Sequence, residues 1–126
     1  MDGRPPLREN VPLPRTKVRI WDLSPLLLCR SHLLGEHREL HAVWSILTRR
    51  KRGYSRHPET LRWAGKTRAL FRRHQALVEE MLRRGYRHAS PLDRRLAKGP
   101  LVQRAFVDSP RAQRRRLRAK GCACRV

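Results

Sequence analysis

Two stretches of this sequence repeat apolar residues with the period of an α-helix, and this repetition limits the fold more than any other feature. From about Ser31 to Arg50, apolar positions recur at steps of three and four, as on one face of an amphipathic helix. Ser31 is suited to cap the start of this helix. The stripe consists of Leu33, His37, Leu40, Trp44 and Leu47.

A second helix is predicted to begin at Pro58, because proline is favoured in the first helical turn and Glu59 suits the same turn. It is expected to end at residues 83–85, where two arginines precede a glycine. The intervening segment, 49–58, contains glycine, serine and proline and is predicted to be a loop. The second stripe consists of Trp63, Thr67, Leu70, His74, Leu77 and Met81.

The segments around the helical pair are less regular. Residues 1–17 hold four of the nine prolines and no apolar period, so a disordered leader is predicted there. Residues 18–24 are expected to lie extended across the helices. After the second helix, residues 92–96 are suited to one further turn, and the basic tail from residue 109 is expected to be helical only when bound.

These features together predict an all-α fold. We expect a compact bundle of two long packed helices with short C-terminal helical turns and an N-terminal extended segment that threads across the helices. The length of 126 residues suits one modest core. The predicted organisation is a leader over 1–17, a helical domain over 18–108 and a basic flexible tail over 109–126.

The charge of the chain indicates its partner. Lysine and arginine number 31 against 10 acidic residues, which gives a formal net charge of +21 and attracts polyanions such as nucleic acid. The longest apolar run, residues 26–29, is far too short to span a bilayer, and the N-terminus has no signal-peptide core. We therefore expect a cytoplasmic, nucleoid-associated protein with no membrane partner.

Carboxylates are few enough to compare one by one. Glu36 and Glu39 lie one turn apart along the edge of the first stripe, where partial burial can shift the pKa of a carboxylate. Glu79 and Glu80 precede two arginines at helical spacing and are interpreted as ordinary surface ion pairs. Asp22 is the remaining candidate for a functional carboxylate.

The spacing of the cysteine and histidine residues matches no metal-binding motif. Residues 122–124 read Cys-Ala-Cys, but a structural zinc site needs four ligands, so Cys29 and this pair are interpreted as free thiols in a reducing compartment. His37 and His41 have helical spacing, yet Arg38 stands where zinc proteases have glutamate, and His37 is interpreted as a packed residue. The sequence therefore predicts no metal site and no cofactor.

The residues alone leave two functional classes open. Phosphate-binding glycine loops, nucleophile elbows and zinc-finger spacings are all missing from the sequence. The pattern therefore predicts a small basic helical protein that binds nucleic acid. It does not decide between an enzyme and a non-catalytic nucleic-acid-binding protein.

The run His32-Leu-x-x-Glu36-x-Arg38-Glu39-Leu40 resembles the active-site helix of the pyrimidine dimer DNA glycosylases with abasic-site lyase activity, of the phage endonuclease V type. Arg19-Ile20 is similar to the Arg-Ile pair that follows the N-terminal residue of that family, so Val18 falls on the N-terminal position. Residues 53–63 resemble the connecting loop of bacterial members, and residues 70–86 resemble the second long helix. The resemblance covers residues 18–92.

This resemblance implies a DNA repair enzyme that acts in two steps on damaged double-stranded DNA, as a monomer. The N-terminal α-amine, here that of Val18, attacks C1′ of the damaged nucleotide and forms an imine, which then permits β-elimination. An α-amine has a pKa of about 8, compared with about 10.4 for lysine, so more of it is nucleophilic. Glu39 is implied as the catalytic carboxylate. The predicted DNA contacts are Arg19, His32, Arg38, His57, Arg72 and Arg73.

The sequence departs from the family pattern in three places. The aromatic and basic C-terminal segment of the family has no match, and Ala42 replaces the arginine three residues after the catalytic glutamate. Seventeen residues also precede Val18. We expect that translation starts at Val18 on a GTG codon, which would give this position the free amine that the implied chemistry needs.

Overall fold

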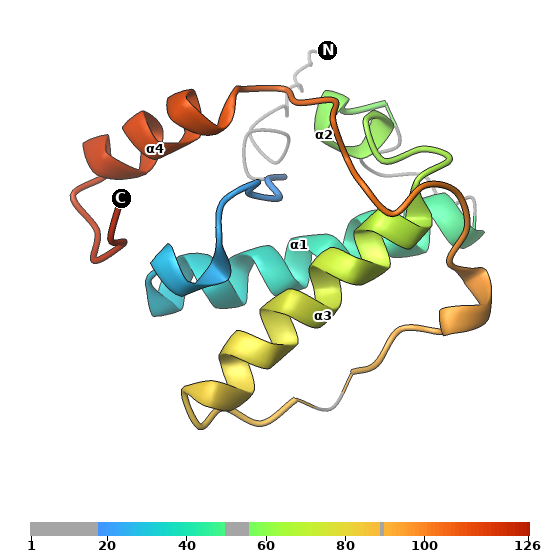
Figure 1. Ribbon diagram of the computed structural model, residues 1–126, viewed down its shortest axis with the longest axis horizontal. Coiled ribbons are helices and arrows are strands. Elements are labelled where there is room, and N and C mark those ends of the chain that lie inside the picture. Colours follow the sequence, from blue (N-terminus) through green and yellow to red (C-terminus); the bar gives the residue numbers. More distant parts are fainter. Residues whose placement is uncertain (1–17, 50–55, 89) are drawn as a thin grey trace, which may run out of the picture.

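The predicted all-α fold is confirmed. The computed structural model describes residues 18–49, 56–88 and 90–126, and every regular element in these ranges is a helix. Two long helices, α1 (Arg30–Arg49) and α3 (Thr67–Arg83), pack against each other, and α4 (Pro110–Ala119) lies apart from this pair (Figure 1). The short helices are η2 (Pro25–Leu27), α2 (Pro58–Leu61) and η3 (Arg94–Leu96).

The predicted leader, residues 1–17, lies outside the described residues, as does most of the predicted loop before α2. None of the helices in the described ranges combines the length and the apolar character that a membrane span needs. The turn expected within residues 92–96 is present as η3, which Asp93 caps by accepting a hydrogen bond from the backbone N–H of Arg95.

Helix α1 begins at Arg30, so Ser31 lies within its first turn and the prediction of Ser31 as the N-cap is wrong. The predicted stripe of α1 largely faces the core, because Leu33, Leu40 and Trp44 are all buried. Glu36 is also buried on this side of the helix, whereas His37 is only half-buried. Glu36 therefore takes the buried position on this helix face that the predicted stripe gave to His37.

Gly65 divides the predicted second helix into α2 and α3. Its φ of +74° is a left-handed conformation that residues with a Cβ rarely adopt, so the prediction of one continuous helix from Pro58 is wrong. The backbone of Gly99 packs directly against this break, where a Cβ on Gly99 would lie 2.0 Å from the carbonyl oxygen of Gly65. The chain after η3 is thereby docked at the start of α3.

The predicted stripe of the second helix is confirmed by burial, since all six of its residues are buried. The predicted stop is also confirmed. Gly85 has a φ of +86°, the N–H of Gly85 donates to the carbonyl of Leu82, and the N–H of Tyr86 donates to the carbonyl of Met81. This is the Schellman arrangement, in which a left-handed glycine closes the last helical turn.

The structure differs from expectation at the C-terminal tail, which forms α4 in the free chain. Ser109 caps this helix by accepting a hydrogen bond from the N–H of Ala112, and Pro110 occupies its first turn. Gln113 and Leu117, one turn apart, are each 1% exposed, and Leu117 belongs to the hydrophobic core. The expectation that this segment is helical only when bound relied on its charge and overlooked this buried face.

Candidate active site

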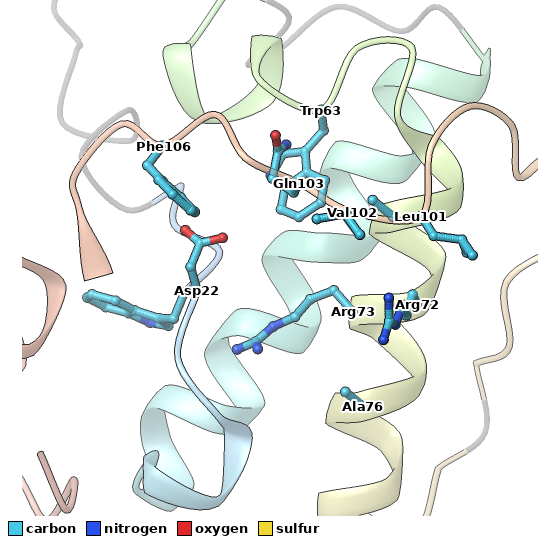
Figure 2. Close-up of a pocket in the computed structure, with 11 residues that line it drawn as sticks. Asp22, Trp63, Arg72, Arg73, Ala76, Leu101, Val102, Gln103 and Phe106 are labelled. Atoms are coloured by element: carbon cyan, nitrogen blue, oxygen red, sulfur yellow. The ribbon is translucent and has the colours of Figure 1, made fainter. Parts of the chain in front are cut away.

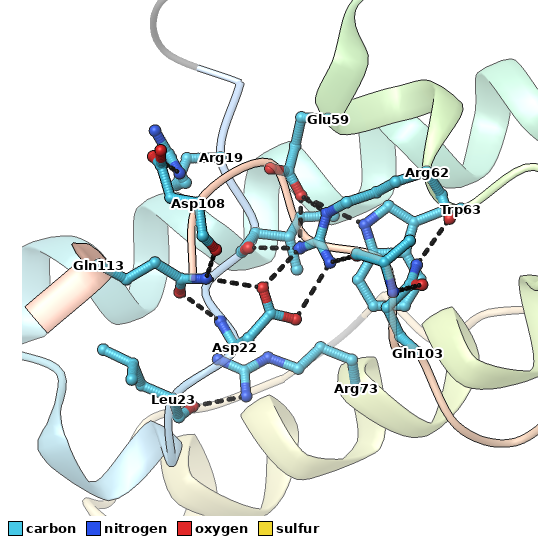
Figure 3. A network of polar contacts seen from close by, with 12 residues as sticks. Arg19, Asp22, Leu23, Glu59, Arg62, Trp63, Arg73, Gln103, Asp108 and Gln113 are labelled. Atoms are coloured by element: carbon cyan, nitrogen blue, oxygen red, sulfur yellow. Dashed lines mark hydrogen bonds and ion pairs between the residues drawn. The ribbon is translucent and has the colours of Figure 1, made fainter. Parts of the chain in front are cut away.

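The buried guanidinium of Arg62 fixes the N-terminal segment in place (Figure 3). Its Nε donates to Oε2 of Glu59 at 2.7 Å, and its Nη2 donates to the carbonyl oxygen of Ile20 at 2.9 Å. Nη1 donates to Oδ1 of Asp22 at 3.1 Å and to the carbonyl oxygen of Ala105 at 2.9 Å. Asp22, a candidate from the sequence, therefore has a structural role.

Helix α4 is attached to the same network. Gln113 and Asp22 form two hydrogen bonds, because the N–H of Asp22 donates to Oε1 of Gln113 at 2.7 Å and Nε2 of Gln113 donates to Oδ2 of Asp22 at 2.8 Å (Figure 3). Asp108, just before α4, pairs with Arg19 at 3.0 Å and with Arg116 at 2.9 Å. The start of the described chain and its last helix are thus held together.

Between α1, the N-terminal segment and α4 lies a cavity of about 500 Å³. Its volume is typical of a ligand site. Four residues predicted as site residues line this cavity together, namely Arg19, His32, Arg38 and Glu39. We call it the Glu39 cavity. Its remaining lining residues are Trp21, Ser31, Gly35, Glu36, Arg116, Ala119 and Lys120.

Glu39 is a carboxylate of this cavity whose Oε1 accepts no hydrogen bond within the described part of the chain. This oxygen atom is buried. Burial raises the pKa of Glu39, and the positive charge of Arg38 only partly opposes this effect. A carboxylate with a raised pKa, placed in a cavity lined by cations, is suited to exchange protons with a bound substrate.

Glu36, three residues earlier on α1, is fully paired. Its carboxylate accepts two hydrogen bonds from Arg73 of α3, at 2.6 Å from Nε and 2.9 Å from Nη2. Arg73 also donates through Nη1 to the carbonyl oxygen of Leu23 at 2.7 Å (Figure 3). Burial raises the pKa of Glu36, and the Arg73 guanidinium opposes this. Glu36 therefore joins α1, α3 and the N-terminal segment.

The remaining predicted site residues do not line the Glu39 cavity. Val18 is 2% exposed and packs in the core, directly before Arg19, which does line the cavity. His57 caps α2, where its Nδ1 accepts a hydrogen bond from the N–H of Glu59 at 3.0 Å. Arg72 and Arg73 line a different cavity, so their role in DNA binding, like that of His57, stays a prediction.

This second cavity, of about 340 Å³, lies between the N-terminal segment, α3 and residues 101–106 (Figure 2). Leu101 and Phe106 line it and remain largely exposed, so this apolar segment covers α3 only in part. Trp21 lines both cavities and therefore separates them. The guanidinium groups of Arg72 and Arg73 are the cationic groups of this second cavity.

Two residues of the Glu39 cavity were not predicted individually. Arg116 on α4 and Lys120, the residue that caps its C-terminal end, complete the wall opposite α1. In the sequence they are two of many basic residues in the tail. Only the cap at Ser109 and the buried positions Gln113 and Leu117 indicate which side of the helix faces the protein, and therefore which basic residues reach the cavity edge.

Four histidines form a second feature that the sequence did not reveal. His37 and His41 of α1 meet His74 of α3 and His88, and their ring nitrogens lie within 4.8 Å of one another. The Nε2 atoms of His37 and His88 are 3.1 Å apart. Burial and the neighbouring histidines lower the pKa of His37 to about 4. The four rings of this histidine tetrad pack against one another, which agrees with the interpretation of His37 as a packed residue.

One of three comparisons with known proteins gave a match. The sequence model for pyrimidine dimer DNA glycosylases matches residues 18–94, more than half of the chain. This range includes Arg19, His32, Arg38 and Glu39, but not α4. Comparisons with curated proteins and with solved structures gave no significant match. On the strength of this family match, the chain belongs to the pyrimidine dimer DNA glycosylase family.

Proposed function

We propose that this protein is a DNA repair glycosylase with abasic-site lyase activity on damaged DNA such as pyrimidine dimers. Membership of the family implies damaged DNA as the substrate. The observation that carries the proposal is Glu39, whose buried Oε1 has no hydrogen-bond partner among the described residues and whose pKa is raised in a cation-lined cavity.

The cations around Glu39 are suited to hold the DNA backbone on both sides of the reacting sugar. Arg19 and Arg38 line the cavity from the N-terminal segment and α1, and Arg116 and Lys120 line it from α4. Arginine binds phosphate oxygens with two parallel hydrogen bonds. DNA contacts by Arg19 and Arg38, predicted from the resemblance, are thus compatible with their positions.

The proposed reaction uses the α-amine of Val18 as the nucleophile. Its lone pair forms a bond to C1′ of the damaged nucleotide, and the glycosidic bond breaks with its electrons on the departing base, which takes up a proton. Loss of the amine protons and opening of the sugar ring give an imine. Removal of a C2′ proton then breaks the C3′–O bond and releases the 3′ phosphate.

Glu39 is proposed to move protons and to stabilise positive charge in this sequence. Its ionised form stabilises the oxocarbenium-like sugar as the base departs. The same carboxylate accepts a proton during imine formation or elimination. The raised pKa of Glu39 favours the proton transfer, because it brings proton uptake and release by the carboxylate closer to neutral pH.

The proposal requires a free amine at residue 18. The family match begins at residue 18, and Arg19 already lines the Glu39 cavity. Burial of the Val18 side chain would hold an amine at this position in one place. We therefore propose that the active form begins at Val18, either through translation from a GTG codon or through removal of residues 1–17.

Borohydride trapping on DNA with one abasic site tests this function. A chain released from a cleavable fusion so that it begins at Val18 should form a covalent adduct, and a chain beginning at Met1 should not. Glu39→Gln should abolish both the adduct and strand cleavage. Glu79→Gln, which changes an exposed glutamate of α3, is the matched control and should retain both. N-terminal mass spectrometry of the native protein identifies its first residue.

The outcome that contradicts the enzyme is equally clear. A correctly folded chain that begins at Val18 and binds damaged DNA without forming an adduct would be a non-catalytic nucleic-acid-binding protein. An adduct formed equally by the chain beginning at Met1 would refute the role of Val18. Analytical ultracentrifugation of the same preparations tests the predicted monomer.

A further inference from the structure

Three cysteines and one histidine from both ends of the described chain converge at the start of α1. Cys29 immediately precedes α1, and His32 lies in its first turn. Cys122 and Cys124 follow α4. The four possible ligand atoms, three sulfurs and one imidazole nitrogen, all lie within 4.8 Å of one another. We call this group the Cys3His cluster.

The individual distances are close to those of a tetrahedral metal site. Nδ1 of His32 is 3.1 Å from Sγ of Cys29 and 3.4 Å from Sγ of Cys124. With Zn–S bonds of about 2.3 Å and Zn–N bonds of about 2.0 Å, ligand atoms of a tetrahedral zinc site lie about 3.5–3.8 Å apart. The described positions need shifts of less than about 1.5 Å to reach this geometry.

We propose that the Cys3His cluster binds one structural Zn²⁺ ion. Three thiolates and one imidazole form a standard closed coordination sphere for structural zinc, with no position left for substrate. None of the three cysteines is in a disulfide, so all three sulfurs are available. The sequence predicted no metal site because Cys122 and Cys124 supply only two ligands. Folding brings the other two from residues at least ninety positions earlier in the chain.

The backbone around the cluster already supports a thiolate ligand. The N–H of Cys29 donates to Sγ of Cys124 at 3.1 Å, a contact that stabilises negative charge on sulfur. The N–H of Arg125 donates to the carbonyl oxygen of Leu27 at 2.7 Å, which pins the C-terminus near the start of α1 (Figure 1). Three thiolates around Zn²⁺ carry an overall negative charge, which suits this cation-rich surface.

The Cys3His cluster is a better zinc site than the histidine tetrad. Both groups bring four ligand atoms within 4.8 Å. The tetrad offers four imidazole nitrogens, whereas the Cys3His cluster offers three sulfurs that, as thiolates, neutralise the charge of the ion. The tetrad is also built into the interface of the two long helices, where direct packing of its rings already holds α1 to α3.

A metal ion in the Cys3His cluster would affect the Glu39 cavity by fixing the position of α4 relative to α1. It would tie the end of α4 to the start of α1, the two elements that form opposite walls of that cavity. His32 would then be a metal ligand rather than a DNA contact, and its place at the edge of the cavity would follow from metal binding. The binding free energy of the ion would contribute directly to folding of the C-terminal segment.

Metal analysis of the full chain tests the proposal. The protein is purified without a histidine tag under reducing conditions and analysed by inductively coupled plasma mass spectrometry, with about one zinc per chain expected. Cys122→Ser and Cys124→Ser should each weaken zinc binding by more than about tenfold. Ala123→Ser, between the two ligands, is the matched control and should retain the metal, as should Glu39→Gln.

A second pair of measurements does not depend on folding of the cysteine variants. Addition of zinc to the metal-free wild-type chain should protect all three cysteines from alkylation and raise the Tm. Replacement of zinc by Co²⁺ should give the thiolate-to-cobalt absorption of a tetrahedral sulfur-ligated site. Zinc that leaves the cysteines reactive, or zinc that is lost in His88→Gln but kept in Cys122→Ser, would overturn the proposal.

Discussion

The two sides of α1 use similar polar residues in opposite ways. On the side that faces α3, Glu36 accepts two hydrogen bonds from Arg73, and the rings of the histidine tetrad pack against one another. On the side that faces α4, Glu39 has a buried oxygen with no partner among the described residues. The first side therefore holds the helices together, and the second keeps a carboxylate ready for an external partner.

This difference teaches how to separate a structural carboxylate from a functional one on the same helix. Burial raises the pKa of both glutamates, so the direction of the shift does not distinguish them. The two glutamates differ in whether their buried oxygens accept hydrogen bonds from the protein. A buried carboxylate oxygen without a hydrogen bond destabilises the fold unless a bound ligand supplies one. Substitutions on the two sides should accordingly separate activity from stability.

The largest expected effect is that of Glu39→Gln on catalysis. Single-turnover cleavage of abasic-site DNA by the chain beginning at Val18 should fall at least about 10²-fold, because a positioned proton-transfer group is lost. The free energy of unfolding at neutral pH should not decrease, since burial disfavours the charged form of Glu39 and no described residue donates a hydrogen bond to its Oε1. If the free energy of unfolding fell together with the cleavage rate, Glu39 would have a structural role like that of Glu36, and the two sides of α1 would not differ.

Glu36→Gln should show the reverse pattern. It leaves the Arg73 guanidinium, which is largely buried, without its anionic partner, and the free energy of unfolding should fall by about 3 kcal/mol. Urea denaturation monitored by circular dichroism measures this, with Glu79→Gln as the exposed control. The double variant Glu36→Gln, Arg73→Gln should lose less than the sum of the single variants. Strict additivity would show that the pair is not coupled.

The histidine tetrad should make stability depend on pH in the acidic range. The pKa of His37 is about 4 in the folded chain and about 6.5 when unfolded, so the unfolded state binds more protons between these values. Stability from this group is therefore present above pH 6.5 and is lost as the pH falls towards 4. After allowance for its solvent exposure, we expect a loss of about 1 kcal/mol by pH 5.

Thermal denaturation in the presence of a metal chelator measures this pH dependence without a contribution from bound metal. His88→Gln removes one of the facing imidazoles and should flatten the profile, because it lessens the repulsion that protonation of His37 would create. His57→Gln, at the start of α2, is a control outside the tetrad. If His88→Gln left the pH dependence of Tm unchanged, repulsion between the histidines could not be its cause.

The smallest expected effect lies on the α4 wall of the Glu39 cavity. Arg116→Ala and Lys120→Ala should each weaken binding to damaged duplex DNA about threefold near physiological salt and lower the salt slope by about one. Tm should change little, since both side chains are exposed. Arg115→Ala, on the same helix but outside the cavity lining, is the control. Equal effects of all three substitutions would mean that α4 attracts DNA only through its total charge.

The sequence predicted most of the α1–α3 framework because its signals are local. Helical periodicity gave the buried residues of α3, and the arginines before Gly85 gave its end. The break at Gly65 escaped prediction because Trp63 and Thr67 keep the helical spacing across it. At that break the backbone of Gly99, which is distant in sequence, packs on the Gly65 carbonyl.

The same distinction divides the site. The sequence by itself determined the helical class and the basic charge, and the resemblance predicted Arg19, Arg38 and Glu39 as site residues, because short motifs carry these features. Tertiary structure decided which of Glu36 and Glu39 is paired. It also decided that α4 completes the Glu39 cavity. Finally, it brought three cysteines from both ends of the described chain next to His32. Pairing, burial and ligand geometry depend on distances between residues far apart in the chain, which no local pattern encodes.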